Sequence, residues 1–300
     1  AAVLKGITTA AISAVFFLQG ARLSRQAIVA GLTHWRLHLL VLSGTFVLFP
    51  LLGLLLKPLL QPLVTPALYL GVLFLCVLPS TVQSSIALTS LARGNVPAAV
   101  CAASASTLLG IALTPWLAGW VLGTQASAAA GVGSGLDAVG KVMLQLLLPF
   151  VAGHLLQPWV GAWVKQRARM LKWVDQGSIM LVVYTAFSAA VAEGLWRQVP
   201  LAALGGLLLI SALLLAVALI SMTLVARRLG FAKADEITIV FCGSKKSLAS
   251  GVPMANVLFP ASLAGSILLP VMVFHQLQLM VCSLLAQRLA RRIESSVDPG

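Results

Sequence analysis

The chain has 300 residues, of which 60% are hydrophobic and 9% are charged, and its net charge is +13. This composition excludes an ordinary water-soluble domain and predicts an all-α polytopic membrane protein whose helices lie mostly in lipid. The basic residues stand singly or in small groups at the ends of apolar segments, with no aromatic-interleaved basic face. The positive charge therefore fits membrane topology and excludes nucleic acid as a partner.

About nine apolar segments are expected to span the membrane, because a spanning helix needs roughly 20 mostly apolar residues. In chain order they cover residues 3–19, 37–56, 67–93, 96–122, 139–160, 176–195, 201–226, 238–259 and 262–285. A stretch rich in Gly, Ala and Ser divides the chain into two halves. We therefore predict one integral membrane domain over residues 1–300, composed of a first half (1–122), a linker (123–135) and a second half (136–300).

The third segment is interrupted by Pro79, because a proline removes a backbone hydrogen bond and kinks a helix. Polar candidates for binding follow this break at Thr81, Gln83, Ser84 and Ser85.

The fourth segment adds the hydroxyl groups of Ser104, Ser106 and Thr107. Such residues permit close helix packing as well as ligand binding, and packing is the more common role for any single one.

The eighth segment carries two lysines, Lys245 and Lys246, in the middle of an apolar stretch. One Lys at the centre of a spanning helix costs roughly 2.5–3.5 kcal/mol, so stability does not explain them. Either they lie in a hydrophilic loop in water, or they face a cavity at a broken helix, as in transporters. The flanking apolar runs are too short to span alone, which favours the second interpretation.

Residues around the lysines extend this candidate site. Ser244 and Ser247 flank the pair as further binding candidates, and Gly243, Gly251 and Pro253 are expected to break the helix.

The distribution of Lys and Arg predicts the topology. Fourteen of them lie in the connectors that follow the odd-numbered segments, whereas Lys57, Lys141 and Arg197 lie on the other side. The positive-inside rule makes the first side cytoplasmic, together with the C-terminus. Ala1 is then outside, and we expect an upstream helix to be missing from this chain. The broken third and eighth segments run in opposite directions, which indicates an inverted repeat whose breaks meet near the midplane.

Three stretches resemble the bile acid/sodium symporter (SBF-like) superfamily, specifically its bacterial YfeH-type symporter branch. They are residues 78–87 (LPSTVQSSIA), 233–240 (KADEITIV) and 241–255 (FCGSKKSLASGVPMA). The resemblance covers essentially the whole chain. It implies a ten-helix fold of two inverted five-helix repeats, with a panel domain and a core domain. The fourth and ninth helices are unwound where they cross, and this chain is similar to helices two to ten.

The resemblance also suggests site residues and one important difference. By position, Ser84 and Ser85 match a Ser-Asn pair that helps to bind sodium in the bile acid branch, and residues 104–107 match its partner helix. A sodium-binding Glu of that branch is replaced here by Phe241, and a sodium-binding Gln by Lys245. A phenyl ring and a fixed cation oppose sodium binding, which needs oxygen ligands.

The resemblance implies a secondary active transporter, a symporter of a small organic anion by alternating access, in the bacterial inner membrane. We expect a lysine, with Lys245 favoured, to replace sodium at the crossing. Proton coupling is reasonable for a buried lysine, and sodium coupling is doubtful.

Two alternatives stay open. A cation/proton antiporter needs a carboxylate at mid-membrane, and the seven Asp and Glu residues fall at segment ends or in tails. A non-transporting regulatory protein is compatible with the same sequence. The chain lacks an HExxH motif, a paired aspartate and a Ser-His dyad, so we predict no enzyme, no metal and no cofactor.

The charge distribution gives a direct test of topology. We expect a phosphatase reporter, which is active only outside the cytoplasm, to be inactive when fused after Gly300, whereas a green fluorescent reporter there fluoresces. Phosphatase activity at this position would contradict the assignment.

Overall fold

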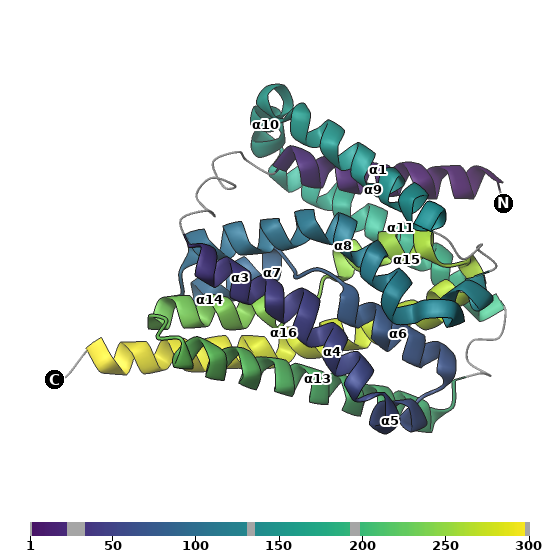
Figure 1. The fold of residues 1–300 in the computed structure, drawn as a ribbon. Helices are drawn as coiled ribbons and strands as arrows, with labels where there is room; N and C mark the ends of the chain where they lie inside the picture. Colours follow the sequence, from purple (N-terminus) through teal and green to yellow (C-terminus); the bar gives the residue numbers. More distant parts are fainter. Residues whose placement is uncertain (1, 23–33, 131–135, 193–198, 298–300) are drawn as a thin grey trace.

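Every described element of the chain is helical (Figure 1). The computed structural model describes residues 2–22, 34–130, 136–192 and 199–297. Its elements, in order, are α1 (Ala2–Arg22), α3 (Trp35–Ser43), the π-helix η1 (Gly44–Leu48), α4 (Phe49–Leu55), α5 (Lys57–Leu60), the 3₁₀ helix η2 (Gln61–Leu63), α6 (Pro66–Val77), α7 (Gln83–Leu91), α8 (Val96–Ala130), α9 (Leu136–Leu155), α10 (Gln157–Gln166), α11 (Ala168–Ala192), α13 (Leu201–Arg228), α14 (Lys233–Gly243), α15 (Leu248–Leu258) and α16 (Ala261–Val297). Helices suit an apolar chain because their backbone hydrogen bonds need no water.

Within the described residues, four helical stretches are long and apolar enough to cross a membrane. They are Trp35–Leu55, Val96–Leu122, Leu201–Arg228 and Leu263–Arg291, which match the second, fourth, seventh and ninth predicted segments. A fifth is added if the bent pair Leu146–Leu155 and Gln157–Val164 counts as one span.

Several helices differ in course or length from the predicted segments: α11 begins at Ala168 and not at residue 176, and α16 continues to Val297 and not to residue 285. The fifth segment is bent by 86° at Leu156 instead of being one straight helix over 139–160. Helix α8 continues to Ala130 into the predicted linker, because its Ala-rich sequence is a good helix former, and residues 131–135 lie outside the described part.

Both segments predicted to be broken are interrupted, at residues 78–82 between α6 and α7 and at residues 244–247 between α14 and α15. Leu78, which precedes Pro79, is extended with φ −69° and ψ 152°, because the proline ring disfavours a helical residue before it. Gly243 is the last residue of α14.

Two of the predicted helix breakers are wrong. Gly251 and Pro253 lie inside α15, whose start is stabilised by the Ser247 side chain accepting a hydrogen bond from the backbone N–H of Ser250. Pro253 has no backbone N–H, so α15 lacks one hydrogen bond at this position but does not end there. The absence of a side chain at Gly251 allows a close approach to the first break, since a Cβ there would lie 2.6 Å from Leu78 Cδ1.

The helices form two groups (Figure 1). A smaller group consists of α1 and the helices that pack against it, α9, α10 and α11. The larger group contains both interrupted helices together with α3, α4, α8, α13 and α16. The groups meet where α8 contacts α9 and where α11 contacts α15 and α16.

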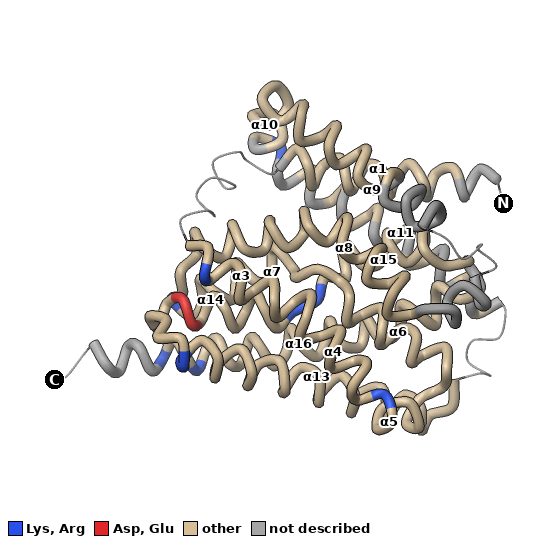
Figure 2. Tube along the Cα trace, viewed as in Figure 1, with Lys and Arg blue, Asp and Glu red and all other residues tan. Residues whose placement is uncertain are grey.

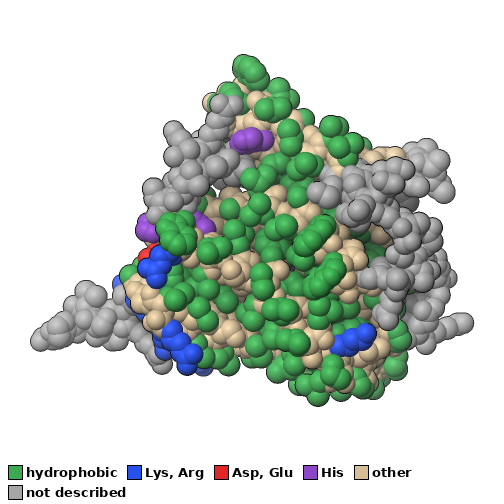
Figure 3. All heavy atoms as spheres, viewed as in Figure 1, with side chains coloured by type: hydrophobic (Ala, Val, Ile, Leu, Met, Phe, Trp, Pro, Cys, Tyr) green, Lys and Arg blue, Asp and Glu red, His purple; other side chains and the backbone are tan. Residues whose placement is uncertain are grey.

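The surface and the charges agree with a membrane setting. Hydrophobic side chains cover the middle of the face shown in Figure 3, and large ones such as Leu55, Trp120 and Leu201 are exposed. Basic residues gather where α13 ends and α14 begins (Figure 2). There Glu236 is held by Arg227 (3.1 Å) and Lys233 (2.7 Å).

Close packing against the first break gives a stability prediction. A Cβ at Gly110 would lie 2.6 Å from the Cβ of Pro79, a rigid neighbour, whereas a Cβ at Gly205 meets nothing within 4 Å. We expect Gly110→Ala to lower the free energy of unfolding by about 1–3 kcal/mol. Gly205→Ala serves as the control and should raise it by up to about 1 kcal/mol. Unfolding in mixed micelles measures both, and a stabilising Gly110→Ala would contradict the packing.

Candidate functional site at the helix crossing

The two interruptions touch each other directly. The backbone N–H of Ser247 donates to the Pro79 carbonyl (2.9 Å), and the Ser80 hydroxyl donates to the Cys242 carbonyl (2.5 Å). The Ser85 hydroxyl donates to the carbonyl of Phe241 (3.1 Å). The last carbonyls of a helix have no partner within it, so these serines satisfy the open end of α14. The crossing is therefore one hydrogen-bonded unit.

Lys246 lies at the centre of this unit with no exposed surface. Its ammonium Nζ donates to three backbone carbonyls, those of Thr45 (2.7 Å), Cys76 (2.8 Å) and Leu78 (2.8 Å). It also lies 4.3 Å from the ring centre of Phe49, a distance at which a cation is attracted by an aromatic face. An ammonium has three hydrogens to donate, and all three are used here.

The carbonyls around Lys246 come from irregular or terminal backbone. Cys76 and Leu78 belong to the C-terminal end of α6, where unpaired carbonyls favour a positive charge. Thr45 belongs to the π-helix η1, a wide turn of the kind that often marks functional positions. The sequence did not signal this π-helix.

Lys245 is also fully buried, but it has different surroundings. Its Nζ donates to the hydroxyl of Ser84 (3.2 Å), and that hydroxyl donates to Thr81 Oγ1 (2.7 Å). The burial of both lysines contradicts the alternative of a loop in water.

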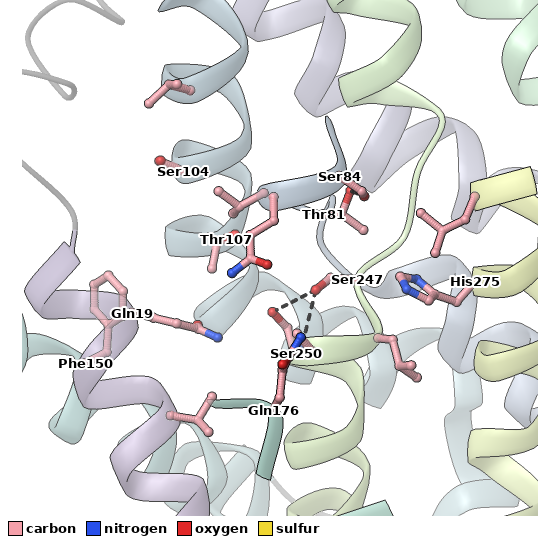
Figure 4. A pocket seen from close by; sticks show the side chains of 17 residues that line it. Gln19, Thr81, Ser84, Ser104, Thr107, Phe150, Gln176, Ser247, Ser250 and His275 are labelled. Atoms are coloured by element: carbon pink, nitrogen blue, oxygen red, sulfur yellow. Dashed lines mark hydrogen bonds between the residues drawn. The ribbon is translucent and has the colours of Figure 1, made fainter. Parts of the chain in front are cut away.

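Next to the crossing, a cavity of about 560 Å³ lies between the two helix groups (Figure 4). The crossing and α8 form one wall, α16 contributes His275 and Leu279, and α1, α9 and α11 contribute Gln19, Phe150 and Gln176. No charged side chain is among the described residues that line this cavity. Its surface combines apolar groups with hydroxyls, amides and one imidazole.

The structure divides the predicted binding residues into two sets. Those that line the cavity are Thr81, Gln83, Ser84, Ser104, Thr107 and Ser247. Those that lie behind its wall, in the crossing, are Ser85, Ser106, Ser244, Lys245 and Lys246. In this second set, Ser106 Oγ accepts from the Ser80 backbone N–H (3.0 Å), and Ser244 Oγ donates to the Val240 carbonyl (2.6 Å).

Sequence reasoning missed other lining residues. Gln19, Gln176, Ser250 and His275 line the cavity but are not among the binding residues predicted from the sequence. The available signal was an uncharged polar residue inside an apolar run. Such residues also pack helices together, so the signal is weak without coordinates.

Comparison with known proteins identifies the family. Residues 1–291 match the SBF-like CPA transporter family. The chain belongs to this family. It is 64% identical over 292 residues to "Uncharacterized protein PA2026" of Pseudomonas aeruginosa, a match that covers 97% of this chain and 86% of that protein.

Two further relatives are named for transport. "Putative symporter YfeH" of Escherichia coli is 57% identical over 290 residues, covering 97% of this chain and 86% of that protein. "Sodium/bile acid cotransporter 7" of Danio rerio is 27% identical over 282 residues, covering 93% and 82%. The family and these relatives are transporters and not enzymes. The chain is accordingly a multi-pass membrane transporter.

The different surroundings of the two lysines predict different effects on stability. Lys246→Met leaves three buried carbonyls without a hydrogen-bond donor, each at a cost of roughly 1–3 kcal/mol. The only gain that offsets this loss is the removal of one buried charge. Lys245→Met removes the donor to one hydroxyl, that of Ser84, which still donates to Thr81 Oγ1. We expect Lys246→Met to lower the free energy of unfolding of the transporter more than Lys245→Met does. Unfolding in mixed micelles measures both. Equal effects would contradict a stabilising role for the three carbonyls around Lys246, which we call the carbonyl cage.

Proposed function

We propose that the chain is a secondary active transporter that moves a small organic anion by alternating access without sodium as the coupling ion. The main support is that the first turns of both α7 and α15 line one cavity. Unpaired N–H groups make the start of a helix favourable for negative charge. Behind the same wall, the Lys245 ammonium lies 3.2 Å from the cavity-lining Ser84 hydroxyl. This positive potential suits a carboxylate.

Lys246 is proposed to take the place of a sodium ion. Its ammonium is surrounded by three carbonyl oxygens, which are the type of ligand that a hard cation prefers. Because the charge is tethered to the chain, the crossing keeps its central cation throughout the cycle. The sequence favoured Lys245 for this role, and the carbonyl cage favours its neighbour.

Lys245 is proposed to carry the coupling proton. Its Nζ donates to a hydroxyl, a group that is compatible with both the charged and the neutral lysine. Buried lysines serve as proton donors and acceptors in other proteins, and this one lies beside the cavity wall. Proton release and solute release would then be coupled at the same place.

The finer architecture is part of this proposal. We infer nine spans in inverted repeats, with the crossing near the bilayer midplane and the smaller helix group acting as a panel against which the larger group moves. Support comes from the two interrupted helices, whose interruptions contact each other, and from a cavity lined by residues of both groups. The bacterial relatives and the basic residues support an inner-membrane location with a cytoplasmic C-terminus.

A cation/proton antiporter is less well supported. It would need a carboxylate at the cation site, and none is found among the described residues that line the cavity.

Vesicles reconstituted with the purified transporter test the proposal. Uptake of labelled acetate, lactate, benzoate, succinate and taurocholate is measured with a proton gradient alone and with a sodium gradient alone. We expect at least one of these anions to enter with the proton gradient and to gain nothing from sodium. Lys245→Met and Lys246→Met should each slow uptake by about tenfold or more, equivalent to roughly 1.4 kcal/mol.

Lys57→Met is the matched control, because it removes a charge at the start of α5, outside the crossing. It should transport as the wild type does. Strict dependence on sodium, or normal uptake by both crossing variants, would refute the proposal.

A further inference from the structure

Gln278 connects α16 to the second interruption. The side chain is fully buried, its Oε1 accepts from the backbone N–H of Lys246 (2.9 Å), and its Nε2 donates to the Lys246 carbonyl (2.8 Å). A backbone N–H can only donate and a carbonyl can only accept, so this pair fixes which end of the amide is the NH₂ group. The orientation of Gln278 therefore follows from the peptide that it contacts.

The same amide nitrogen also contacts His275. Gln278 Nε2 lies 2.8 Å from Nδ1 of the imidazole. An amide NH₂ has two hydrogens and no lone pair for accepting, so its second hydrogen must be donated to Nδ1. Nδ1 is then unprotonated, and the neutral ring carries its hydrogen on Nε2.

His275 belongs to the cavity wall. Figure 4 shows its ring extending from α16 toward Ser247 and the cavity. Two of the hydroxyls on this wall already donate to the protein: Ser247 Oγ to Ser250 Oγ (3.2 Å) and Thr107 Oγ1 to the Ala103 carbonyl (3.0 Å). A histidine whose ring lines the cavity and whose hydrogen is fixed on one nitrogen adds a donor of defined position.

We propose that His275 is a specificity-determining residue, held by Gln278 as the neutral imidazole with its hydrogen on Nε2, which donates to an acceptor oxygen of the transported solute. The proposal rests on the function proposed above, in which that oxygen belongs to a carboxylate. Because Gln278 also clamps the Lys246 peptide, a solute bound to His275 is connected through one side chain to the loop that carries the caged ammonium.

The first test reads the tautomer and needs no transport. The protein is labelled with ¹⁵N in its four histidine rings, and His275→Gln assigns the resonances of His275. We expect an unprotonated Nδ1 and a protonated Nε2 in the wild type. A hydrogen on Nδ1 would overturn the proposal.

The second test measures binding of the same five carboxylates by titration calorimetry. Glutamine at position 275 offers a neutral donor and acceptor like those of the imidazole, whereas leucine offers neither. We expect His275→Gln to bind within about threefold of the wild type and His275→Leu to bind about tenfold or more weakly. Neither variant removes the Gln278 clamp on Lys246.

The results separate this proposal from the general one. Normal binding by His275→Leu, with anion uptake intact in vesicles, overturns the role of His275 alone. Failure of the wild type to bind any of the five carboxylates overturns it as well. Loss of binding in His275→Leu with retention in His275→Gln supports it.

Discussion

An ammonium group removed from water must receive hydrogen bonds from its surroundings, and the centre of this protein is arranged around that requirement. Burial without compensation would cost several kcal/mol or would remove the charge. Lys246 meets the requirement with three carbonyls and an aromatic ring. Those carbonyls are available only because α6 ends at Val77 and because the second span widens into a π-helix. The irregular backbone and the buried charge therefore stabilise each other.

The two interrupted helices compensate each other in a reciprocal way. Lys246, from the second interruption, satisfies carbonyls at the end of α6. Ser80 and Ser85, beside the first interruption, satisfy carbonyls at the end of α14. Neither break could be opened without leaving buried polar groups unpaired, which is costly in a low-dielectric interior. In the proposed alternating-access cycle, this mutual dependence would keep the crossing together as one body.

The charged side chains of the site and the side chains that line its cavity lie in different places. The cavity presents neutral hydroxyl, amide and imidazole groups, while both lysines lie behind its wall. A cation that does not touch the solute directly can still attract an anion, since electrostatic interactions extend further than contact in an interior of low dielectric. Neutral donors at defined positions, such as the one proposed at His275, would then distinguish one anion from another. In the proposed function, the lysines would attract anions as a class and the neutral groups would select among them.

The sequence by itself determined the membrane class, the positions of both interruptions and the presence of two lysines in the second one. Each follows from the local cost of a proline or a lysine in an apolar run. The prediction that Gly251 and Pro253 break the helix was wrong, because the Ser247 cap and the packing against Leu78 outweigh the low helix propensity of these two residues. Only the tertiary structure decided which carbonyls receive the Lys246 ammonium, because they lie 168 to 201 residues away in the chain. It also brought His275 to the cavity and Gln278 to the Lys246 peptide, because packing between helices, and not spacing within one helix, decides these two placements.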